Sequence, residues 1–236
     1  MDPEFARHYY ESSAPDHWWF RGRAELVEKL LARHGARQGR ALDIGAGSTT
    51  LMPVGIETVR LDVVVPTPAG HGPFVNASAL TLPFRASTFS LVGLFDLIEH
   101  VDDEARLLGE VRRVLTPGGA VVATVPAHEW LWSHHDVQVA HIRRYSVRQL
   151  GAAFAAAGFR VELCRPFYGF LLAPAIARKV MRLQGGISRP GRIINRILGE
   201  IASRSVERSL RHQTFGLSIA LLAFANDSNH REHVFE

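Results

Sequence analysis

Apolar residues recur with two different periods along the chain. Short continuous apolar runs, typical of buried strands, occur at 41–44, 59–65, 74–77, 90–94, 120–125, 159–164 and 217–225. Between these runs, apolar residues recur every three or four positions, which predicts helices at 24–34, 102–115 and 147–157. Strands that alternate with helices indicate parallel βαβ units. We therefore predict an α/β protein with a doubly wound, Rossmann-like sheet of about seven strands.

The segment 167–213 has a different pattern. Isoleucines and leucines recur there at helical spacing among many arginines, which predicts basic amphipathic helices inserted before the last strand. Such helices suit an anionic lipid surface, an acidic substrate or nucleic acid, and an ordinary solvated face explains them equally well. We treat 1–236 as one domain, with 167–213 as an acceptor-binding or peripheral membrane element.

Composition narrows the class of protein. The 236 residues are 47% hydrophobic and 21% charged, as expected of a globular protein, and the formal net charge is +4. Cys164 is the one cysteine, so neither a disulfide framework nor a cysteine-based zinc site is present. No apolar run reaches the length of a membrane span. We expect a cytoplasmic protein, with membrane association as an option, and the sequence indicates no oligomeric state.

The segment Leu42–Thr49 carries the clearest chemical motif. A strand ends in Asp43 and turns through Gly45, Ala46 and Gly47, where glycines allow a ligand to approach the backbone closely. The dinucleotide fingerprint would place a further glycine at position 50, which is Thr50. An acid at this point suits a ligand that carries an ammonium group.

Asp62 lies at the end of the second predicted strand, 19 positions after Asp43. A carboxylate at this place in a doubly wound sheet can accept hydrogen bonds from both hydroxyls of a ribose. Taken alone, Asp62 could be a turn residue. Together with the glycine loop, it favours a nucleoside-containing ligand.

Six segments, in this order and spacing, resemble class I S-adenosylmethionine-dependent methyltransferases over nearly the whole chain. They are Leu42–Gly47, Asp62, Leu82–Phe84, Phe89–Val92, Ile98–Val101 and Arg112–Gly119. The segments His17–Arg21, Pro126–Trp132 and His141–Tyr145 are similar to a bacterial subgroup of the type 11 and type 12 methyltransferases. The resemblance implies a mostly parallel sheet with an antiparallel last strand, and S-adenosylmethionine as the cofactor.

The resemblance also implies roles for individual residues. Asp43, Gly45, Ala46 and Gly47 would hold the methionine end of the cofactor, Asp62 the ribose, and Val63, Ser78 and Ala79 the adenine. Asp96 would face the sulfonium. An N-terminal lid at 1–23 would place Trp18 and Trp19 near the acceptor, and packing of this segment onto the domain explains its aromatic residues equally well. The chain departs from the family at Ser78, where an acid is frequent, and at Thr49, where a third glycine is frequent.

Methyl transfer from a sulfonium is an in-line displacement that depends mainly on alignment, and a hydroxyl acceptor usually also needs a base. His128, His141 and Tyr145 are the candidate bases, the two histidines first because they follow the fifth predicted strand. His100, Arg143 and Arg144 are candidates for binding the acceptor, since arginines pair well with acidic groups.

Two questions stay open: whether a metal binds, and what the protein acts on. Asp96, Glu99 and His100 could ligate a divalent metal, as in some quinone and small-RNA methyltransferases. We favour a loop-to-helix junction there and no metal. The preferred acceptor is a small or lipid-like molecule, such as one of secondary metabolism, that is methylated on oxygen or nitrogen. Methylation of RNA and a non-catalytic cofactor-binding module are the alternatives, although no nucleic-acid-binding module is evident.

Overall fold

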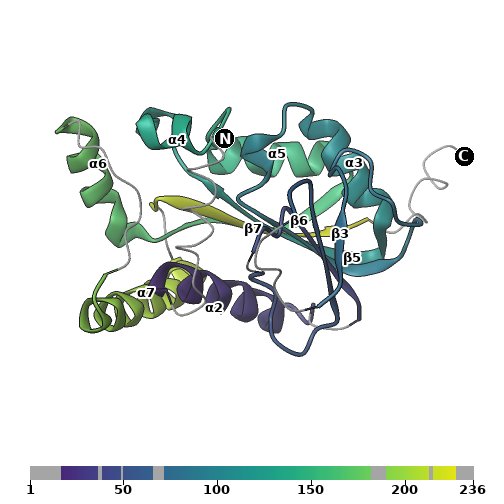
Figure 1. Ribbon diagram of the computed structural model, residues 1–236, viewed down its shortest axis with the longest axis horizontal. Helices are drawn as coiled ribbons and strands as arrows, with labels where there is room; N and C mark the ends of the chain where they lie inside the picture. The colour runs from purple at the N-terminus through teal and green to yellow at the C-terminus, as the bar shows by residue number, and fades with distance from the viewer. Residues whose placement is uncertain are drawn as a thin grey trace, which may run out of the picture.

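The computed structural model describes residues 17–36, 39–48, 50–65, 72–181, 190–212 and 215–226. Seven strands form one sheet in the order β3-β2-β1-β4-β5-β7-β6 (Figure 1). The strands are β1 (Ala41–Ile44), β2 (Thr58–Asp62), β3 (Phe74–Asn76), β4 (Phe89–Phe95), β5 (Leu115–Pro126), β6 (Phe159–Phe167) and β7 (Ser218–Ala225).

Strands β1 to β5 are parallel, and β7 lies antiparallel between β5 and β6. The predicted sheet with an antiparallel last strand is therefore confirmed. One boundary differs, because β2 ends at Asp62 and not at Val65. Val63, Val64 and Val65 are more than half exposed, so these apolar residues belong to a surface loop.

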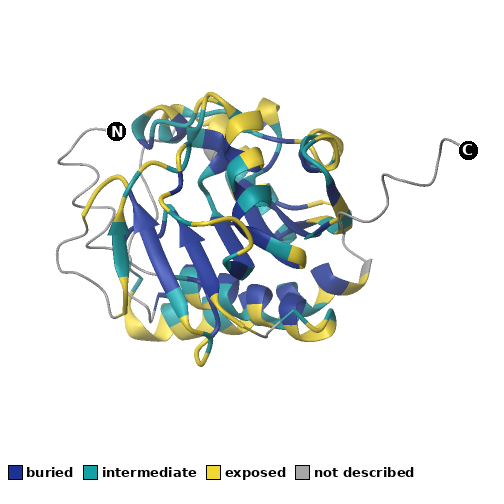
Figure 2. Cartoon of the chain, turned by 90° about the vertical axis from the view of Figure 1, so that its right-hand side faces the viewer, coloured by how far each residue is buried: buried dark blue, intermediate teal, exposed yellow. Residues whose placement is uncertain are grey.

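Helices cover both faces of the sheet (Figures 1 and 2). One face carries α3 (Glu104–Val114) and α5 (Val147–Ala156), and the other carries α2 (Trp18–Arg33) and α7 (Arg192–His212). The shorter helices are η1 (Ile98–His100), η2 (Glu129–Leu131), α4 (His134–Gln138), η3 (Gly169–Leu171) and α6 (Leu172–Val180). Buried residues concentrate on the sheet and on the helix faces that meet it (Figure 2).

The first described helix begins at Trp18, six residues earlier than predicted. His17 caps it, because its Nδ1 accepts a hydrogen bond from the backbone N–H of Trp19 at 3.2 Å. The last residues of the predicted lid therefore form the first turns of α2, and residues 1–16 lie outside the described part of the chain. Trp18 and Trp19 are 7% and 8% exposed and pack against the ring of Tyr168. Both rings lie in the core, and their contact with an acceptor stays a prediction.

Helix α7 is only partly an insertion. In its second half, Ala202, Val206 and Leu210 are buried against α2 and the sheet, so this half completes a layer of the domain. Its first half carries exposed isoleucines, considered below. Residues 182–189 of the predicted insertion lie outside the described part.

Candidate functional site

Asp43 lies at the base of the glycine loop and is almost fully buried, with 1% exposed. Neither of its carboxylate oxygens has a hydrogen-bond partner of ordinary geometry among the described residues. Burial raises the pKa of Asp43 to about 7, although the nearby Thr50 hydroxyl and Arg60 lower it. An unsatisfied buried carboxylate is costly, and a positively charged ligand group would relieve this cost.

Backbone geometry in the loop requires glycine. Gly45 and Gly47 have φ values of 73° and 51°, in the left-handed region that other residues rarely adopt. A Cβ atom at position 45 would also lie 2.8 Å from Cδ1 of Leu97. The backbone N–H groups of Gly45 and Ala46 both donate to the carbonyl of Leu61, which anchors the loop to β2.

Asp62 joins this loop to the end of β2. Its Oδ2 accepts a hydrogen bond from the backbone N–H of Gly47 at 2.9 Å, and its Oδ1 accepts from Val64 N–H at 3.0 Å. Each carboxylate oxygen keeps a further lone pair, so Asp62 can still accept hydroxyl donors. Val63 is 67% exposed directly beside it and offers an apolar surface to a planar ring.

Ser78 and Ala79 follow β3. The Ser78 hydroxyl accepts a hydrogen bond from the backbone N–H of Leu80 at 3.2 Å, so it closes a local turn. Ala79 packs against the core beneath it. This explains how the chain accommodates serine where the family often has an acid: the side chain stabilises the loop itself.

Asp96 follows β4 and has a φ of 50°, a backbone conformation that is uncommon outside glycine. It forms an ion pair with the guanidinium of Arg23 from α2, and Thr124 of β5 donates to the same carboxylate at 3.3 Å. Arg23 is 2% exposed, and its pattern in the sequence did not predict this role. The available signal was its position on the apolar stripe of α2, between Trp19 and Leu26.

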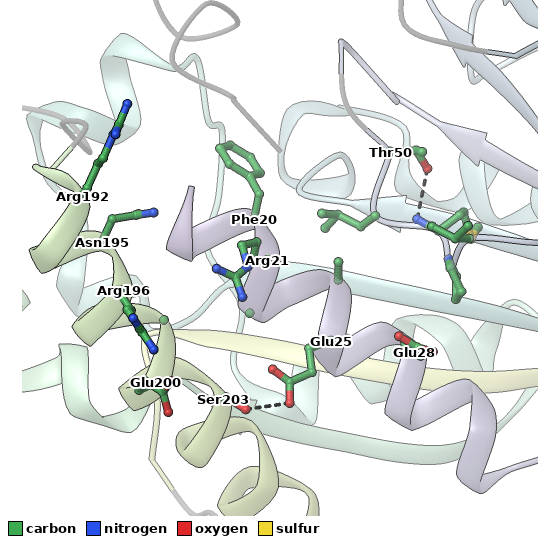
Figure 3. A pocket seen from close by; sticks show the side chains of 17 residues that line it. Phe20, Arg21, Glu25, Glu28, Thr50, Arg192, Asn195, Arg196, Glu200 and Ser203 are labelled. Atoms are coloured by element: carbon green, nitrogen blue, oxygen red, sulfur yellow. Dashed lines mark hydrogen bonds between the residues drawn. The ribbon is translucent and has the colours of Figure 1, made fainter. Parts of the chain in front are cut away.

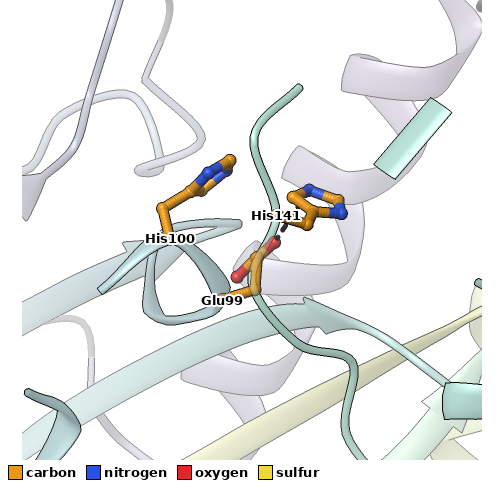
Figure 4. A group of neighbouring side chains, drawn as sticks. All are labelled: Glu99, His100 and His141. Carbon is orange, nitrogen blue, oxygen red and sulfur yellow. Dashed lines mark ion pairs between the residues drawn. The ribbon is translucent and has the colours of Figure 1, made fainter. Parts of the chain in front are cut away.

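A second polar cluster contains the side chains of Glu99, His100 and His141 (Figure 4). Nε2 of His141 lies 3.8 Å from Oε1 of Glu99, and its Nδ1 lies 2.8 Å from Oδ1 of Asp136. The His100 ring meets that of His141 edge to face, with 4.8 Å between centroids. Burial, and then the nearby Asp96, raises the pKa of Glu99 well above its ordinary value. Burial, and then His141, lowers the pKa of His100.

The structure places His128 and Tyr145 in different surroundings. His128 has a φ of 64°, and its buried Nε2 has no hydrogen-bond partner among the described side chains and backbone. The Tyr145 hydroxyl donates to Glu104, and burial together with this carboxylate raises the pKa of Tyr145. Because a raised pKa makes its phenolate harder to form, Tyr145 suits the role of a base less well than predicted.

Arg143 and Arg144 both bind groups of the protein itself. Arg144 donates to both carboxylate oxygens of Asp136, at 2.7 and 2.9 Å. Although burial raises the pKa of Asp136, hydrogen bonds with His141 and Arg144 hold it well below its ordinary range. Arg143 donates to the carbonyls of Val101 and Asp102 at 3.1 Å. These contacts tie the loops of the site together, and binding of the acceptor by the two arginines stays a prediction.

A separate cavity of about 860 Å³ lies between α2, the first half of α7 and residues 50–54 (Figure 3). Arg21, Arg192 and Arg196 extend from its walls, and Glu25 and Glu200 lie among them. None of the predicted cofactor residues lines it. The predicted cofactor residues instead lie at or just after the carboxyl ends of β1, β2, β3 and β4, the edge of the sheet where doubly wound folds bind ligands.

The residues at this edge fit S-adenosylmethionine. The unpaired buried carboxylate of Asp43 suits the ammonium group of its methionine end, and Asp62 suits its ribose. The sulfonium would supply an activated methyl group beside Asp96, the acid that follows β4. The metal hypothesis changes in one respect, because Asp96 pairs with Arg23 and the described group of close potential ligands is Glu99, His100 and His141.

Comparisons with known proteins give the same assignment. The profile of the methyltransferase domain family matches residues 15–163, more than half of the chain. A relative named as a probable S-adenosylmethionine-dependent methyltransferase, from Mycolicibacterium smegmatis, is 27% identical over 176 residues, which cover 70% of this chain and 68% of the relative.

Solved structures share the fold at low sequence identity. The 1,6-didemethyltoxoflavin-N1-methyltransferase of Burkholderia thailandensis, solved with bound S-adenosylhomocysteine, aligns with a TM-score of 0.57 and 17% identity, over 95% of this chain and 88% of that one. The cyclase SpnF aligns with a TM-score of 0.55 and 20% identity, over 86% and 82%. A cyclase within this fold shows that the fold alone does not define the reaction. The profile match over more than half of the chain, together with the relatives, decides the class: this chain belongs to the methyltransferase domain family and is an S-adenosylmethionine-dependent methyltransferase.

Proposed function

We propose that the enzyme transfers the methyl group to an oxygen or nitrogen of a small-molecule or lipid-like acceptor. The observation that carries this proposal is His128, two residues beyond β5 at the carboxyl edge of the sheet. Its left-handed backbone costs about 1–3 kcal/mol, and strain of this size is often kept at functional sites. Its buried Nε2 is unpaired among the described residues and can accept a proton.

In this proposal the protein aligns the acceptor and removes its proton. The acceptor atom would lie between His128 and the methyl-bearing sulfur beside Asp96. As the new bond to the methyl carbon forms, the carbon–sulfur bond breaks, and the acceptor proton goes to Nε2 of His128. A positioned base of this kind contributes roughly 10²- to 10⁴-fold to the rate.

Labelled methyl transfer tests this role. The enzyme is incubated with S-adenosylmethionine labelled in its methyl group and a panel of phenols, amines, phospholipids and bulk RNA. With a phenol acceptor found in this way, His128→Gln should lower kcat at least about 100-fold and leave S-adenosylhomocysteine affinity unchanged. The exposed His134 gives the matched control, His134→Gln, which should keep normal turnover.

Each outcome of this experiment has a defined meaning. Turnover by His128→Gln at the parental rate would remove His128 as the base. Label found in RNA alone would replace the acceptor class. A folded protein that binds the cofactor and labels nothing in the panel would favour the non-catalytic module.

A lipid-like acceptor is supported by the first half of α7. Ile193, Ile194 and Ile197 are 77%, 55% and 54% exposed, and Arg192 and Arg196 are exposed beside them. This half of α7 lies near α6 at the end of the molecule where α4 follows β5 (Figure 1). Exposed apolar residues flanked by arginines suit the surface of an anionic membrane. No described helix has the length and apolar character to cross a membrane.

Vesicle binding tests this surface. The protein should sediment with phosphatidylglycerol vesicles and only weakly with phosphatidylcholine vesicles. The double variant Ile193→Glu/Ile197→Glu should reduce sedimentation about tenfold or more. Val147→Glu is the control, because Val147 is 36% exposed at the start of α5, on the opposite face of the sheet from α7. Unchanged sedimentation of the double variant would rule out this membrane surface.

A further inference from the structure

Glu99, His100 and His141 bring three potential metal ligands together from two distant segments (Figure 4). Glu99 and His100 belong to η1, and His141 follows α4. One ligand atom from each residue lies within 4.8 Å of the others. We propose that this cluster is a site for a divalent transition-metal ion of the Zn²⁺ type, beside the sulfonium position.

The surroundings of Glu99 support a bound cation. Its side chain is fully buried, and neither carboxylate oxygen has a hydrogen-bond partner among the described residues. Buried polar groups are nearly always satisfied, and those that are not call for an explanation such as a missing ion. The closest ring nitrogen is Nε2 of His141, at 3.8 Å, which is too far for a hydrogen bond. A cation between these atoms would satisfy both.

The orientation of the two imidazoles supports the same conclusion. Metal-binding histidines usually donate the proton of their other ring nitrogen to a carboxylate or to a backbone carbonyl. Nδ1 of His141 lies 2.8 Å from Oδ1 of Asp136, and Nδ1 of His100 lies 3.1 Å from the carbonyl of Ala140. Both contacts fix the tautomer that leaves Nε2 free to bind a metal.

The groups behind the ligands are also fixed. Asp136 is fully buried and accepts hydrogen bonds from Arg144 and from the backbone N–H of Ser133. The Ile142 backbone N–H donates to the carbonyl of Glu99 at 2.9 Å, which ties the segment of His141 directly to η1. The cluster is therefore held by long-range contacts, as an organised site requires.

The donor set determines the class of metal. Two imidazoles and one carboxylate suit zinc and its first-row neighbours, whereas calcium and magnesium prefer oxygen ligands alone. Ligand atoms around a tetrahedral zinc ion are about 3.3 Å apart, given bonds of about 2.0–2.1 Å. The ligand atoms here are 3.8 Å apart for His141 and Glu99 and up to 4.8 Å apart across the group, so binding would draw the side chains together by up to about 1.5 Å. Three protein ligands leave one position open.

The open position would bind an oxygen of the acceptor and lower its pKa, as metal ions do for bound water. This use of the ion rests on the proposed function, because it requires an oxygen acceptor. The binding of the ion does not depend on it. The two parts can therefore be tested separately.

Metal titration tests the site directly. Untagged protein, freed of metal by a chelator, is titrated with Zn²⁺ by calorimetry and with Co²⁺ by visible absorption. We expect one high-affinity equivalent and the Co²⁺ spectrum of a site with mixed nitrogen and oxygen ligands. Glu99→Gln and His141→Ala should each weaken binding at least about tenfold, and Asp136→Asn, behind the ligands, about 10- to 100-fold.

The control is His134→Ala, which removes an exposed histidine outside the cluster and should leave binding unchanged. Far-ultraviolet circular dichroism establishes that each variant is folded, and Glu99→Gln keeps the shape of its side chain. The absence of a high-affinity equivalent in the parent, or parental affinity in Glu99→Gln, would overturn the proposal. Titration of the same samples with S-adenosylhomocysteine separates loss of the metal from loss of the cofactor site.

Discussion

The two halves of the carboxyl edge of the sheet are built in different ways. At β1 and β2, Asp43, the glycine loop and Asp62 lie within 20 residues of sequence, and one hydrogen bond from Gly47 to Asp62 joins them. At β4 and β5, Asp96 pairs with Arg23 from 73 residues earlier, and Glu99 meets His141 from 42 residues later. The cofactor side is thus a local motif, whereas the acceptor side depends on tertiary contacts.

This difference explains what the sequence could predict. The strand pattern, the antiparallel last strand and the acidic glycine loop follow from local periodicity and family resemblance, and the structure has the same strands. The role of Arg23 was only weakly indicated by the sequence, since a lone arginine on the apolar face of a helix does not show which residue it pairs with. The role of Arg144 was also hidden, because only the folded chain brings its guanidinium to Asp136.

The predicted start of the first helix and the predicted end of the second strand were wrong for physical reasons. His17 can accept the capping hydrogen bond of a helix, which allows α2 to begin before the apolar stripe is obvious. The valines at 63–65 resemble a strand in sequence, yet they are exposed at the sheet edge. Exposed apolar residues beside a binding loop are better explained by a ligand surface than by a core.

Removing the ion pair between Arg23 and Asp96 should have the largest of the predicted effects. It acts on the acceptor side of the sheet edge. Arg23→Met should lower the free energy of unfolding by about 2–3 kcal/mol, because it leaves Asp96 without its cation in a partly buried position. Chemical denaturation measures this change. The matched control is Arg40→Met, whose pair with Glu57 is exposed and should contribute less than about 1 kcal/mol. Equal effects of the two variants would mean that the Arg23 pair does not organise this half.

Removing the carboxylate that would bind the ribose should affect the cofactor side of the sheet edge and have little effect on the acceptor side. Asp62→Ala should weaken S-adenosylhomocysteine binding by about 1–3 kcal/mol, through lost hydrogen bonds to a buried ribose. Asp102→Ala serves as the control, because Asp102 is an exposed acid at the start of the loop before α3. Calorimetry gives both affinities. Parental affinity in Asp62→Ala would contradict the assignment of the ribose.

The raised pKa of Asp43 predicts a smaller effect that depends on pH. Since the pKa of this carboxyl is about 7 without the cofactor, most of the protein carries a proton there at pH 6. Binding of an ammonium group favours the ionised form, so affinity should rise with pH and level off above pH 7. Between pH 6 and 7.5 the expected gain is about eightfold, or roughly 1.2 kcal/mol.

Two comparisons check that this pH dependence belongs to Asp43. In Asp43→Asn the rise should disappear, because no proton is displaced from the side chain. Calorimetry in buffers of different ionisation enthalpy should show that cofactor binding at pH 6 releases about one proton from the parent protein. Binding by Asp43→Asn should release none from this position. Affinity that falls or stays constant over this range would contradict the pairing of Asp43 with the ammonium group.

The most direct test of the account is calorimetric titration of the purified protein with S-adenosylmethionine and, separately, with S-adenosylhomocysteine. We predict one site per chain with micromolar affinity, equivalent to about −8 kcal/mol. Folded protein that binds neither molecule would contradict the central claim that Asp43, Gly45, Gly47 and Asp62 form a working cofactor site.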